Sequence, residues 1–284
     1  MDIRKRMLHP FARRFFAGTA LEDAVIRARA VNAQGMGVTL DFLGEDVTDT
    51  REAESAMQEY SRAIGAIAKE HLDASLAIKL THIGLDIGRE VAEQNALTLI
   101  ESARGLGVFV WVDMEGSEHT DDTVGIYKTL IERYPGAAGL AVQAYLKRTR
   151  ADLKVLVESG AKLRLVKGAY REPPEKALQD MYGIRARFLA MMSYLFANSA
   201  NFAIGTHDRG LIQKGLAMSI GSRGMPEFQM LMGMRDDLKR SLVKKGLRVI
   251  EYVPYGSDWY GYGMRRLKEK RRNVLYFMQG LFGR

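Results

Sequence analysis

The chain has 284 residues, 47% of them hydrophobic and 27% charged, a composition that excludes disordered, collagen-like and coiled-coil proteins. Because the sequence contains no cysteine, disulfides, thiolate nucleophiles, iron–sulfur clusters and cysteine-ligated zinc are excluded as well. Lys and Arg total 42 against 34 for Asp and Glu, a net charge of +8, which favours an anionic partner such as a nucleic acid, an acidic membrane surface, a phosphate-bearing cofactor or a carboxylate substrate.

Residues 1–36 are predicted to form a helical lead packed on the outside of the domain that follows, and the clearest helical pattern runs from Thr19 or Ala20 to Asn32. The basic N-terminus lacks the apolar stretch and the cleavage site of a secretory signal. No segment reaches the roughly 20 apolar residues that span a bilayer. We therefore expect a cytoplasmic protein, or one peripheral at the inner face of the membrane.

Eight short runs of β-branched, aromatic and aliphatic residues are predicted to be strands. They start at Gly37, Ser75, Val108, Gly139, Lys162, Phe202, Glu227 and Arg248. The starts lie roughly 30 residues apart, the length of one β–α–β unit, and helical patterns such as 52–71 and 95–104 lie between them. This alternation predicts an α/β protein with a parallel sheet.

Each predicted strand carries a polar residue in its C-terminal part, which favours a closed barrel over an open doubly wound sheet. These residues are Asp41, Lys79, Asp113, Gln143, Lys167, His207, Gln229 and Tyr252. Barrel enzymes build their active sites at this end of the strands. We therefore predict a (β/α)₈ TIM-type barrel over residues 37–284, preceded by the helical segment 1–36.

Several common signatures are missing, among them the Walker loop, the complete G-x-G-x-x-G, H-E-x-x-H and G-x-S-x-G. Any dinucleotide must therefore be held in another way. No second histidine lies at metal-ligand spacing from His207, so no metal is expected.

The segment 252–269 contains a predicted helix that starts near Trp259, with Ser257 or Asp258 as its cap. Four residues at positions i, i+3, i+4 and i+7 share one face of this helix: Tyr262, Arg265, Arg266 and Glu269. Two adjacent guanidiniums can hold one carboxylate or phosphate from two sides. A solvated basic helix is the alternative. Gly261 and Gly263 destabilise a helix, which suggests one that moves.

The segment 164–172, RLVKGAYRE, places cations and a glycine at the end of a predicted strand. Strand alternation puts Arg164 on the same face as Val166 and Gly168, so the guanidinium points into the barrel or at a helix. A buried arginine needs a counter-charge, and a reduced flavin or a phosphate would serve. The alternative is a structural ion pair with Asp113 or Glu227.

Three further residues have a functional and a structural interpretation. Lys79 and Asp113 on neighbouring strands belong to the strand-end pattern, yet each could be half of a salt bridge, including one with the other. Gln143 can recognise an amide edge through its donor and acceptor groups, or it can be a hydrogen-bonded core glutamine.

Eight motifs in chain order resemble those of the proline dehydrogenase family. They are LDFLGE (40–45), IKLT (78–81), VDMEG (112–116), VQAYL (142–146), RLVKGAYRE (164–172), THD (206–208), EFQML (227–231), and YVPYG (252–256) with YGYGMRRLKE (260–269). The resemblance covers about residues 20–275 and is closest to the monofunctional bacterial, FAD-dependent enzymes. It implies a distorted (β/α)₈ barrel.

The resemblance also implies the reaction. L-proline would be oxidised to Δ1-pyrroline-5-carboxylate by hydride transfer to N5 of FAD, as the first step of proline catabolism to glutamate, and a quinone would then reoxidise the flavin. The chain is shorter than bifunctional relatives that carry a fused aldehyde dehydrogenase, so a separate pyrroline-5-carboxylate (glutamate semialdehyde) dehydrogenase would take the product.

The matching motif positions imply roles for individual residues. Lys79, Arg265 and Arg266 would clamp the substrate carboxylate, with Asp113 beside them. The slot for the proline ring would be shaped by Tyr170, Leu231, Tyr252 and Tyr262. Arg164 would lie near flavin N5 and Gln143 at the pyrimidine edge. The other cofactor-binding residues would be Val166, Lys167, Gly168, Ala169, Arg171, Thr206, His207, Gln229 and Glu269. Tyr252 would crowd a 4-hydroxyl group, which predicts a preference for proline over 4-hydroxyproline.

The sequence departs from the family pattern at Gly205, where alanine is expected, and at Met232, where an aromatic residue is more usual. It also has Gly263 and Met264 where bulkier residues precede the arginines. These changes bear on the adenine side of the cofactor site and on helix stiffness.

One alternative function is a flavin-free (β/α)₈ enzyme acting on a phosphorylated substrate. Another is a protein that binds nucleic acid or a membrane surface, although no nucleic-acid partner is expected. Residues 273–282 either close the barrel, which we favour, or lie on a bilayer.

Overall fold

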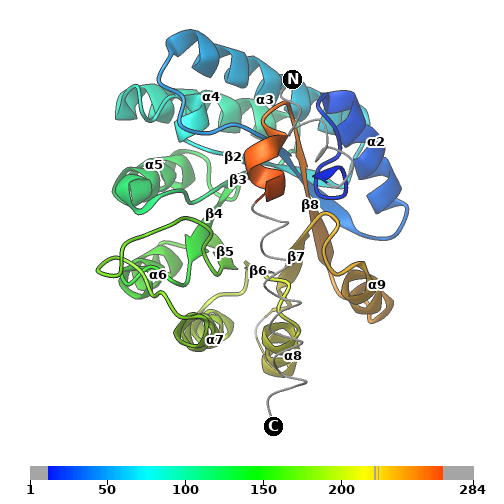
Figure 1. Cartoon of the computed structure of the whole chain (residues 1–284), viewed down its shortest axis with the longest axis vertical. Helices are drawn as coiled ribbons and strands as arrows, with labels where there is room; N and C mark the ends of the chain where they lie inside the picture. Colours follow the sequence, from blue (N-terminus) through cyan, green and yellow to red (C-terminus); the bar gives the residue numbers. More distant parts are fainter. Residues whose placement is uncertain (1–11, 221, 223, 265–284) are drawn as a thin grey trace.

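Eight parallel strands form a closed barrel surrounded by helices in the computed structural model, which describes residues 12–220, 222 and 224–264 (Figure 1). The strands are β1 (Gly37–Phe42), β2 (Ala74–Ile78), β3 (Val110–Val112), β4 (Ala138–Gln143), β5 (Lys162–Val166), β6 (Phe202–Gly205), β7 (Glu227–Leu231) and β8 (Val249–Tyr255). The barrel closes between β8 and β1, where Leu40 pairs with Val253. The predicted (β/α)₈ fold is thus confirmed, and each predicted strand lies within two residues of its observed start.

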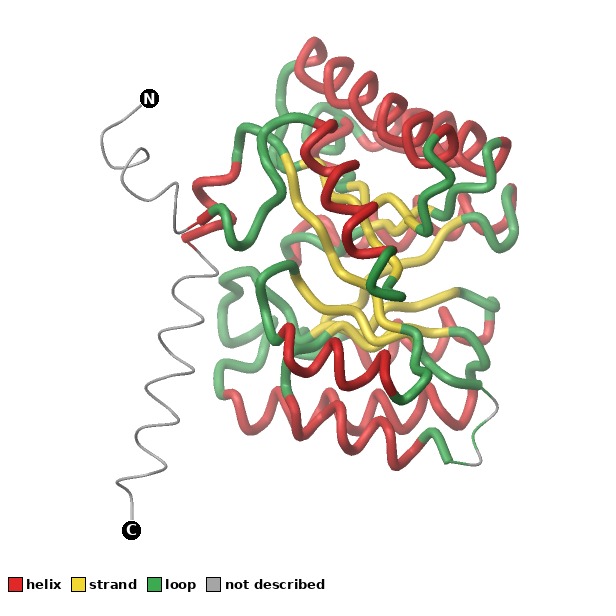
Figure 2. Tube along the Cα trace, turned by 90° about the vertical axis from the view of Figure 1, so that its right-hand side faces the viewer, coloured by secondary structure: helices red, strands yellow, loops and turns green. Residues whose placement is uncertain are grey.

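Helices follow the strands in alternation and cover the barrel from outside (Figure 2). They are α3 (Thr50–Lys69), α4 (Arg89–Gly105), α5 (Thr120–Arg133), α6 (Thr149–Glu158), α7 (Met181–Asn198), α8 (Arg209–Met218) and α9 (Asp236–Lys244), with short 3₁₀ turns η1 (Thr81–Ile83) and η2 (Ser117–His119). Helix α3 begins two residues before its predicted start because the Asp49 side chain accepts hydrogen bonds from the N–H groups of Arg51 and Glu52.

Helix α2 (Leu21–Asn32) precedes the first strand and packs against β8 and β1. A buried ion-pair group attaches it there: Glu251 on the outer side of β8 forms ion pairs with Arg27 of α2 and with the fully buried Lys239 of α9. Among the helices that the structure describes, none is long and apolar enough to cross a membrane.

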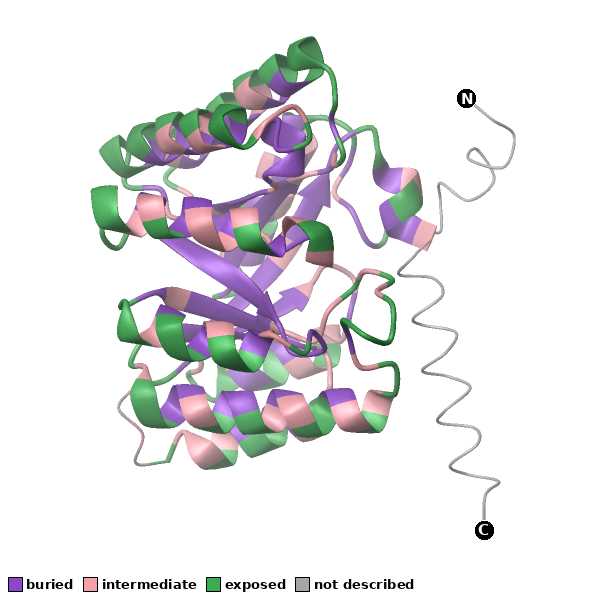
Figure 3. Ribbon diagram, turned by 90° about the vertical axis from the view of Figure 1, so that its left-hand side faces the viewer, coloured by how far each residue is buried: buried purple, intermediate pink, exposed green. Residues whose placement is uncertain are grey.

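Successive strand residues alternate between an apolar layer under the helices and a largely polar barrel interior. On β3, Val110 and Val112 join the main hydrophobic core, whereas Trp111 points inward. Figure 3 shows buried strands enclosed by helices whose outer faces are exposed. Gly139 on β4 leaves room for the Trp111 ring, since a Cβ at this position would lie 2.5 Å from it. Because of this alternation, inward polar residues such as Asp41, Arg164 and Gln229 gather near the carboxyl ends of the strands.

Candidate active site

A cavity of about 1300 Å³ opens at the carboxyl ends of the strands, and residues from all eight strands or the loops after them line it. This is the end at which barrel enzymes place their active sites. Its volume exceeds the roughly 300–1,000 Å³ typical of sites for small molecules. The cavity can therefore hold a large cofactor together with a small substrate.

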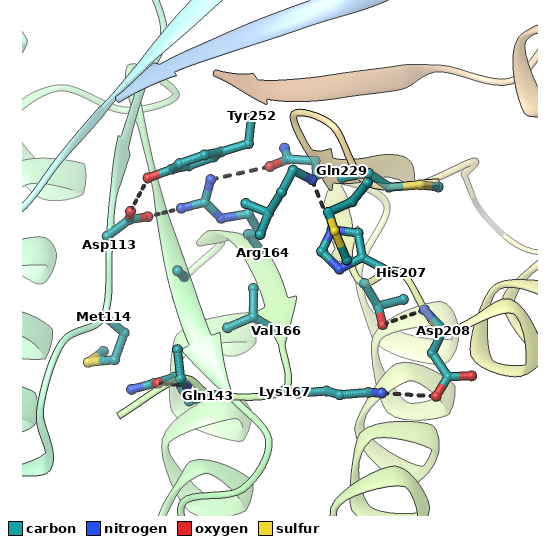
Figure 4. A pocket seen from close by; sticks show the side chains of 18 of the residues that line it. Asp113, Met114, Gln143, Arg164, Val166, Lys167, His207, Asp208, Gln229 and Tyr252 are labelled. Carbon is teal, nitrogen blue, oxygen red and sulfur yellow. Dashed lines mark hydrogen bonds and ion pairs between the residues drawn. The ribbon is translucent and has the colours of Figure 1, made fainter. Parts of the chain in front are cut away.

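Arg164 lies at the floor of the cavity, where it is surrounded by Asp113 after β3, Gln229 on β7 and Tyr252 on β8 (Figure 4). It forms an ion pair with Asp113, and its Nη1 donates to Oε1 of Gln229 at 3.2 Å. The Tyr252 hydroxyl donates to the other oxygen of Asp113 at 2.6 Å. Burial lowers the pKa of Arg164, yet a guanidinium remains charged in proteins. The expected alternative of an ion pair with Asp113 is thus observed.

The Tyr252 ring lies close to the guanidinium, with its centroid 5.5 Å from Cζ of Arg164. Burial, together with the charge of Asp41, raises the pKa of the Tyr252 phenol well above its usual value. The phenol therefore stays protonated and remains the donor in its bond to Asp113.

Lys79, directly after β2, contacts Asp41 on β1 rather than Asp113: its Nζ lies 3.2 Å from Oδ1 of Asp41. Burial by itself would lower the pKa of Lys79, but Asp41, Tyr60, Tyr170 and Glu45 outweigh this effect and raise the pKa above its usual value. Lys79 is thus a permanently charged cation in the cavity wall and is unsuited to act as a base.

Tyr170 in the loop after β5 lines the cavity, and its hydroxyl donates to Oε2 of Glu45 in the loop after β1 at 3.0 Å. Leu231 and Tyr262 line the same cavity, and Tyr262 also packs in a small cluster with Phe16 and Trp259. The structure thereby brings together the four residues assigned to the ring slot, Tyr170, Leu231, Tyr252 and Tyr262.

Gln143 is buried at the end of β4, and the protein supplies partners for its amide. Its Nε2 donates to the carbonyl of Glu115 at 2.8 Å, and its Oε1 accepts from the N–H of Ala169 at 3.4 Å. The interpretation as a hydrogen-bonded core glutamine is therefore supported, although Gln143 also lines the cavity.

A second part of the cavity is formed by the loops after β5 and β6. Lys167 donates to Asp208 at 2.9 Å, and Arg185 from α7 lies 3.1 Å from the same carboxylate. Burial of Asp208 would raise its pKa, but the hydrogen bond and charge of Lys167, the N–H of Leu211 and the charge of Arg185 outweigh it and lower the pKa. Asp208 thus keeps its negative charge and holds two cations at this wall.

Hydrogen bonds within the protein also hold the neighbouring residues of this wall in place. His207 Nε2 accepts from the N–H of Leu231 at 3.0 Å, so a neutral His207 carries its proton on Nδ1. The Thr206 hydroxyl accepts from the N–H of Asp208 at 3.3 Å. Gly168 has a φ of +116°, and a Cβ there would lie 2.2 Å from the Tyr145 ring, so only glycine fits.

Three cations of this wall were missed from the sequence: Arg185, Arg209 and Lys214. Arg209 begins α8 directly after the THD motif, and this proximity is the signal that could have identified it. Arg185 lies far from any assigned motif and offered no local signal.

The other residues assigned from the sequence fall into three groups. Val166, Gly168, Ala169, Thr206 and Gln229 line the cavity with those described above. Arg171 is exposed and does not belong to the cavity lining. The helix expected near Trp259 does begin there and is described to residue 264, whereas Arg265, Arg266, Glu269 and the segment 273–282 lie outside the described residues.

Comparisons with known proteins point to one family. The family model described as "Proline dehydrogenase" matches residues 24–278. Proline dehydrogenase 1 of Bacillus subtilis subsp. natto is 36% identical over 274 residues, which cover 95% of this chain and 90% of that protein. The proline dehydrogenase of Deinococcus radiodurans is 31% identical over 289 residues, covering 99% and 93% of the two chains.

Among solved structures, the fold resembles proline utilization A from Bdellovibrio bacteriovorus, inactivated by N-propargylglycine, with a TM-score of 0.86 and 23% identity. The match covers 93% of this chain and 33% of that one. The chain therefore spans about one third of this much longer protein.

Proposed function

Because the chain belongs to the proline dehydrogenase family, we propose that it oxidises L-proline to Δ1-pyrroline-5-carboxylate with FAD as its first electron acceptor. Family membership makes it an oxidoreductase of proline catabolism. The observation that carries the finer proposal is the division of one large cavity into a floor around Arg164 and a cationic wall around Lys167.

The residues present fit FAD. Arg164, hydrogen-bonded to Gln229, would offer a charge to a flavin ring at the cavity floor, and Gln143 at the end of β4 lines the same cavity. Lys167, Arg185, Arg209 and Lys214 offer positive charge to a pyrophosphate at the wall. Bound FAD would supply the oxidant: its N5 would accept a hydride from the ring carbon of proline that is bonded to nitrogen and does not carry the carboxylate. Arg164 would stabilise the negative charge that reduction adds.

The substrate site would lie between this floor and the ring slot. Lys79 keeps its charge at the cavity wall and suits a carboxylate, and the resemblance to the family implies that Arg265 and Arg266 would belong to the same clamp. Tyr252 and Leu231 would flank the proline ring. Asp113 would hold both Arg164 and Tyr252 in place, so the protein contributes orientation and charge.

Two further partners are proposed, one that accepts the electrons from the flavin and one that takes the product. A quinone would reoxidise the flavin, and a separate pyrroline-5-carboxylate dehydrogenase would take the product. We place the enzyme in the cytoplasm, with peripheral contact at the inner face of the membrane where the quinone is dissolved. Residues 37–284 would form the catalytic barrel and residues 1–36 its helical lead.

A visible absorption spectrum of the purified protein tests the proposal. The protein is incubated with FAD if it is colourless, and the spectrum is taken before and after anaerobic addition of L-proline. We expect flavin bands that bleach with proline. A protein that binds no flavin would reject the proposal and favour the barrel enzyme for a phosphorylated substrate.

A further inference from the structure

A chain of polar side chains crosses the barrel interior from the cavity floor toward the opposite end of the barrel. At the cavity end are Asp113, Arg164 and Gln229, all three of which line the cavity. At the far end are Glu227 and Lys162, the first residues of β7 and β5. Neither Glu227 nor Lys162 lines the cavity, so these two residues have no part in the site described above.

Every link of this chain is a hydrogen bond or an ion pair. Nζ of Lys162 donates to Oε1 of Glu227 at 3.0 Å, and Nε2 of Gln229 donates to Oε2 of Glu227, also at 3.0 Å. Nη1 of Arg164 donates to Oε1 of Gln229 at 3.2 Å. Each oxygen of the Glu227 carboxylate therefore accepts one bond, and the Gln229 amide connects Glu227 to the guanidinium.

Glu227 determines which way the Gln229 amide points. An amide has a donor end and an acceptor end, and Gln229 lies between a guanidinium that can only donate and a carboxylate that can only accept. Only one orientation satisfies both neighbours, with the oxygen toward Arg164. Without the carboxylate, a turned amide would present its own N–H groups to Arg164, and one donor of this buried cation would lose its acceptor.

We propose that Glu227 is a positioning residue for Arg164: it fixes the Gln229 amide, which holds the guanidinium at the cavity floor where it sets the reduction potential of the flavin. The inference rests on the proposed function, because it takes FAD as the group above Arg164. Its physical basis is that an interaction with developing charge is strongest when the donor is held in place beforehand.

Two substitutions of Glu227 disturb the amide in different ways. In E227Q the side chain has one acceptor oxygen, for which Lys162 and Gln229 compete, and the negative charge is lost. In E227D the charge and a partner for the flexible Lys162 remain, but the carboxylate is one methylene too short for Gln229. K162M is the matched control, because it removes the opposite charge and leaves the contact between Glu227 and Gln229 intact; a methionine suits the place of the lysine over Phe109 and Trp111.

The experiment uses the full chain loaded with FAD. We would measure the two-electron reduction potential of the bound flavin, and, by anaerobic stopped flow, the limiting rate of its reduction by L-proline and the dissociation constant of proline. For E227D and E227Q we expect a limiting rate about tenfold lower and a potential about 30 mV lower, the equivalent of a tenfold change in equilibrium constant. The dissociation constant of proline should not change, and K162M should match the wild type in all three measurements.

A pure charge effect gives a different pattern. E227D would then match the wild type, whereas E227Q and K162M would shift the potential in opposite directions, and this result would overturn the inference. Circular dichroism and flavin content identify a variant that has lost its fold. If E227Q unfolds, E227D, which keeps the ion pair with Lys162, provides the test of the inference.

The two proposals fail in distinguishable ways. A wild-type protein that binds no flavin would overturn the proposed function and this inference with it. Normal bleaching of the wild type by proline, combined with wild-type behaviour of E227D, would overturn the inference alone.

Discussion

Lys79 and Asp41 face each other across β1 and β2 with Nζ and Oδ1 3.2 Å apart, and this pair forms part of the cavity wall. The lysine keeps its charge because Asp41 and nearby oxygen groups outweigh the effect of burial. A carboxylate entering the cavity therefore meets a cation that the protein has already positioned, at little cost in side-chain entropy.

We predict that Lys79→Met raises the Michaelis constant for proline by about 10- to 100-fold, since one hydrogen bond to a charged group contributes about 1.5–3 kcal/mol. Steady-state kinetics at fixed quinone concentration would check this. Lys154→Met, at an exposed position of α6, is the control. An unchanged Michaelis constant in the Lys79 variant would contradict the role in the clamp.

Substrate choice gives a second prediction. If Tyr252, which lines the cavity and bonds Asp113, flanks the proline ring as we propose, a 4-hydroxyl on the substrate would crowd its phenol. The wild type should prefer L-proline to 4-hydroxyproline by about 10- to 100-fold in kcat/KM, and Tyr252→Ala should narrow the ratio. Equal efficiency of the wild type on both substrates would show the assignment to be mistaken.

The buried group around Glu251 gives a prediction for stability. Glu251→Gln leaves Lys239 buried without its counter-charge and weakens the contact with Arg27, which should lower the free energy of unfolding by about 3–5 kcal/mol. Urea denaturation would measure the change. Glu70→Gln is the control: it removes an exposed ion pair with Arg29 and should have little effect.

The stabilisation by Asp208 should depend on pH. Its pKa is lowered in the folded protein, so its contribution is fully present above the pKa of the unfolded chain, about 3.9, and is lost as pH falls through the folded value. Asp208→Asn keeps an acceptor for the first turn of α8 but loses the charge. We expect the wild type to have the higher Tm at about pH 7, and the difference to shrink at about pH 3. A difference that does not depend on pH would exclude the ion pairs as its cause.

Much of the fold was predictable because it depends on short-range patterns. Runs such as that from Gly139 have the residues of buried strands, and their spacing leaves room for one helix each. The polar residues at strand ends, Asp113 and Gln143 among them, indicated the end of the barrel that carries the cavity. The family motifs then assigned roles that neither pattern could supply.

The contacts between these residues were less predictable. Lys79 and Asp113 were candidates for one salt bridge, yet they have different partners, Asp41 and Arg164. The sequence also gave no reason to connect Arg185 with Asp208, because the two come from different helices and loops. Arg171, which the motif placed at the cofactor, lies exposed outside the cavity lining.

The sequence by itself determined the barrel, the end at which the cavity opens and the chemical types of the residues around it, because strand period and helix spacing are local properties of the chain. Only the tertiary structure decided which charges meet. Inward side chains of alternate strands share a layer in such a barrel, so Arg164 on β5 reaches Asp113 after β3 and Gln229 on β7. This choice depends on barrel closure and on the register of all eight strands, and no single segment contains that information.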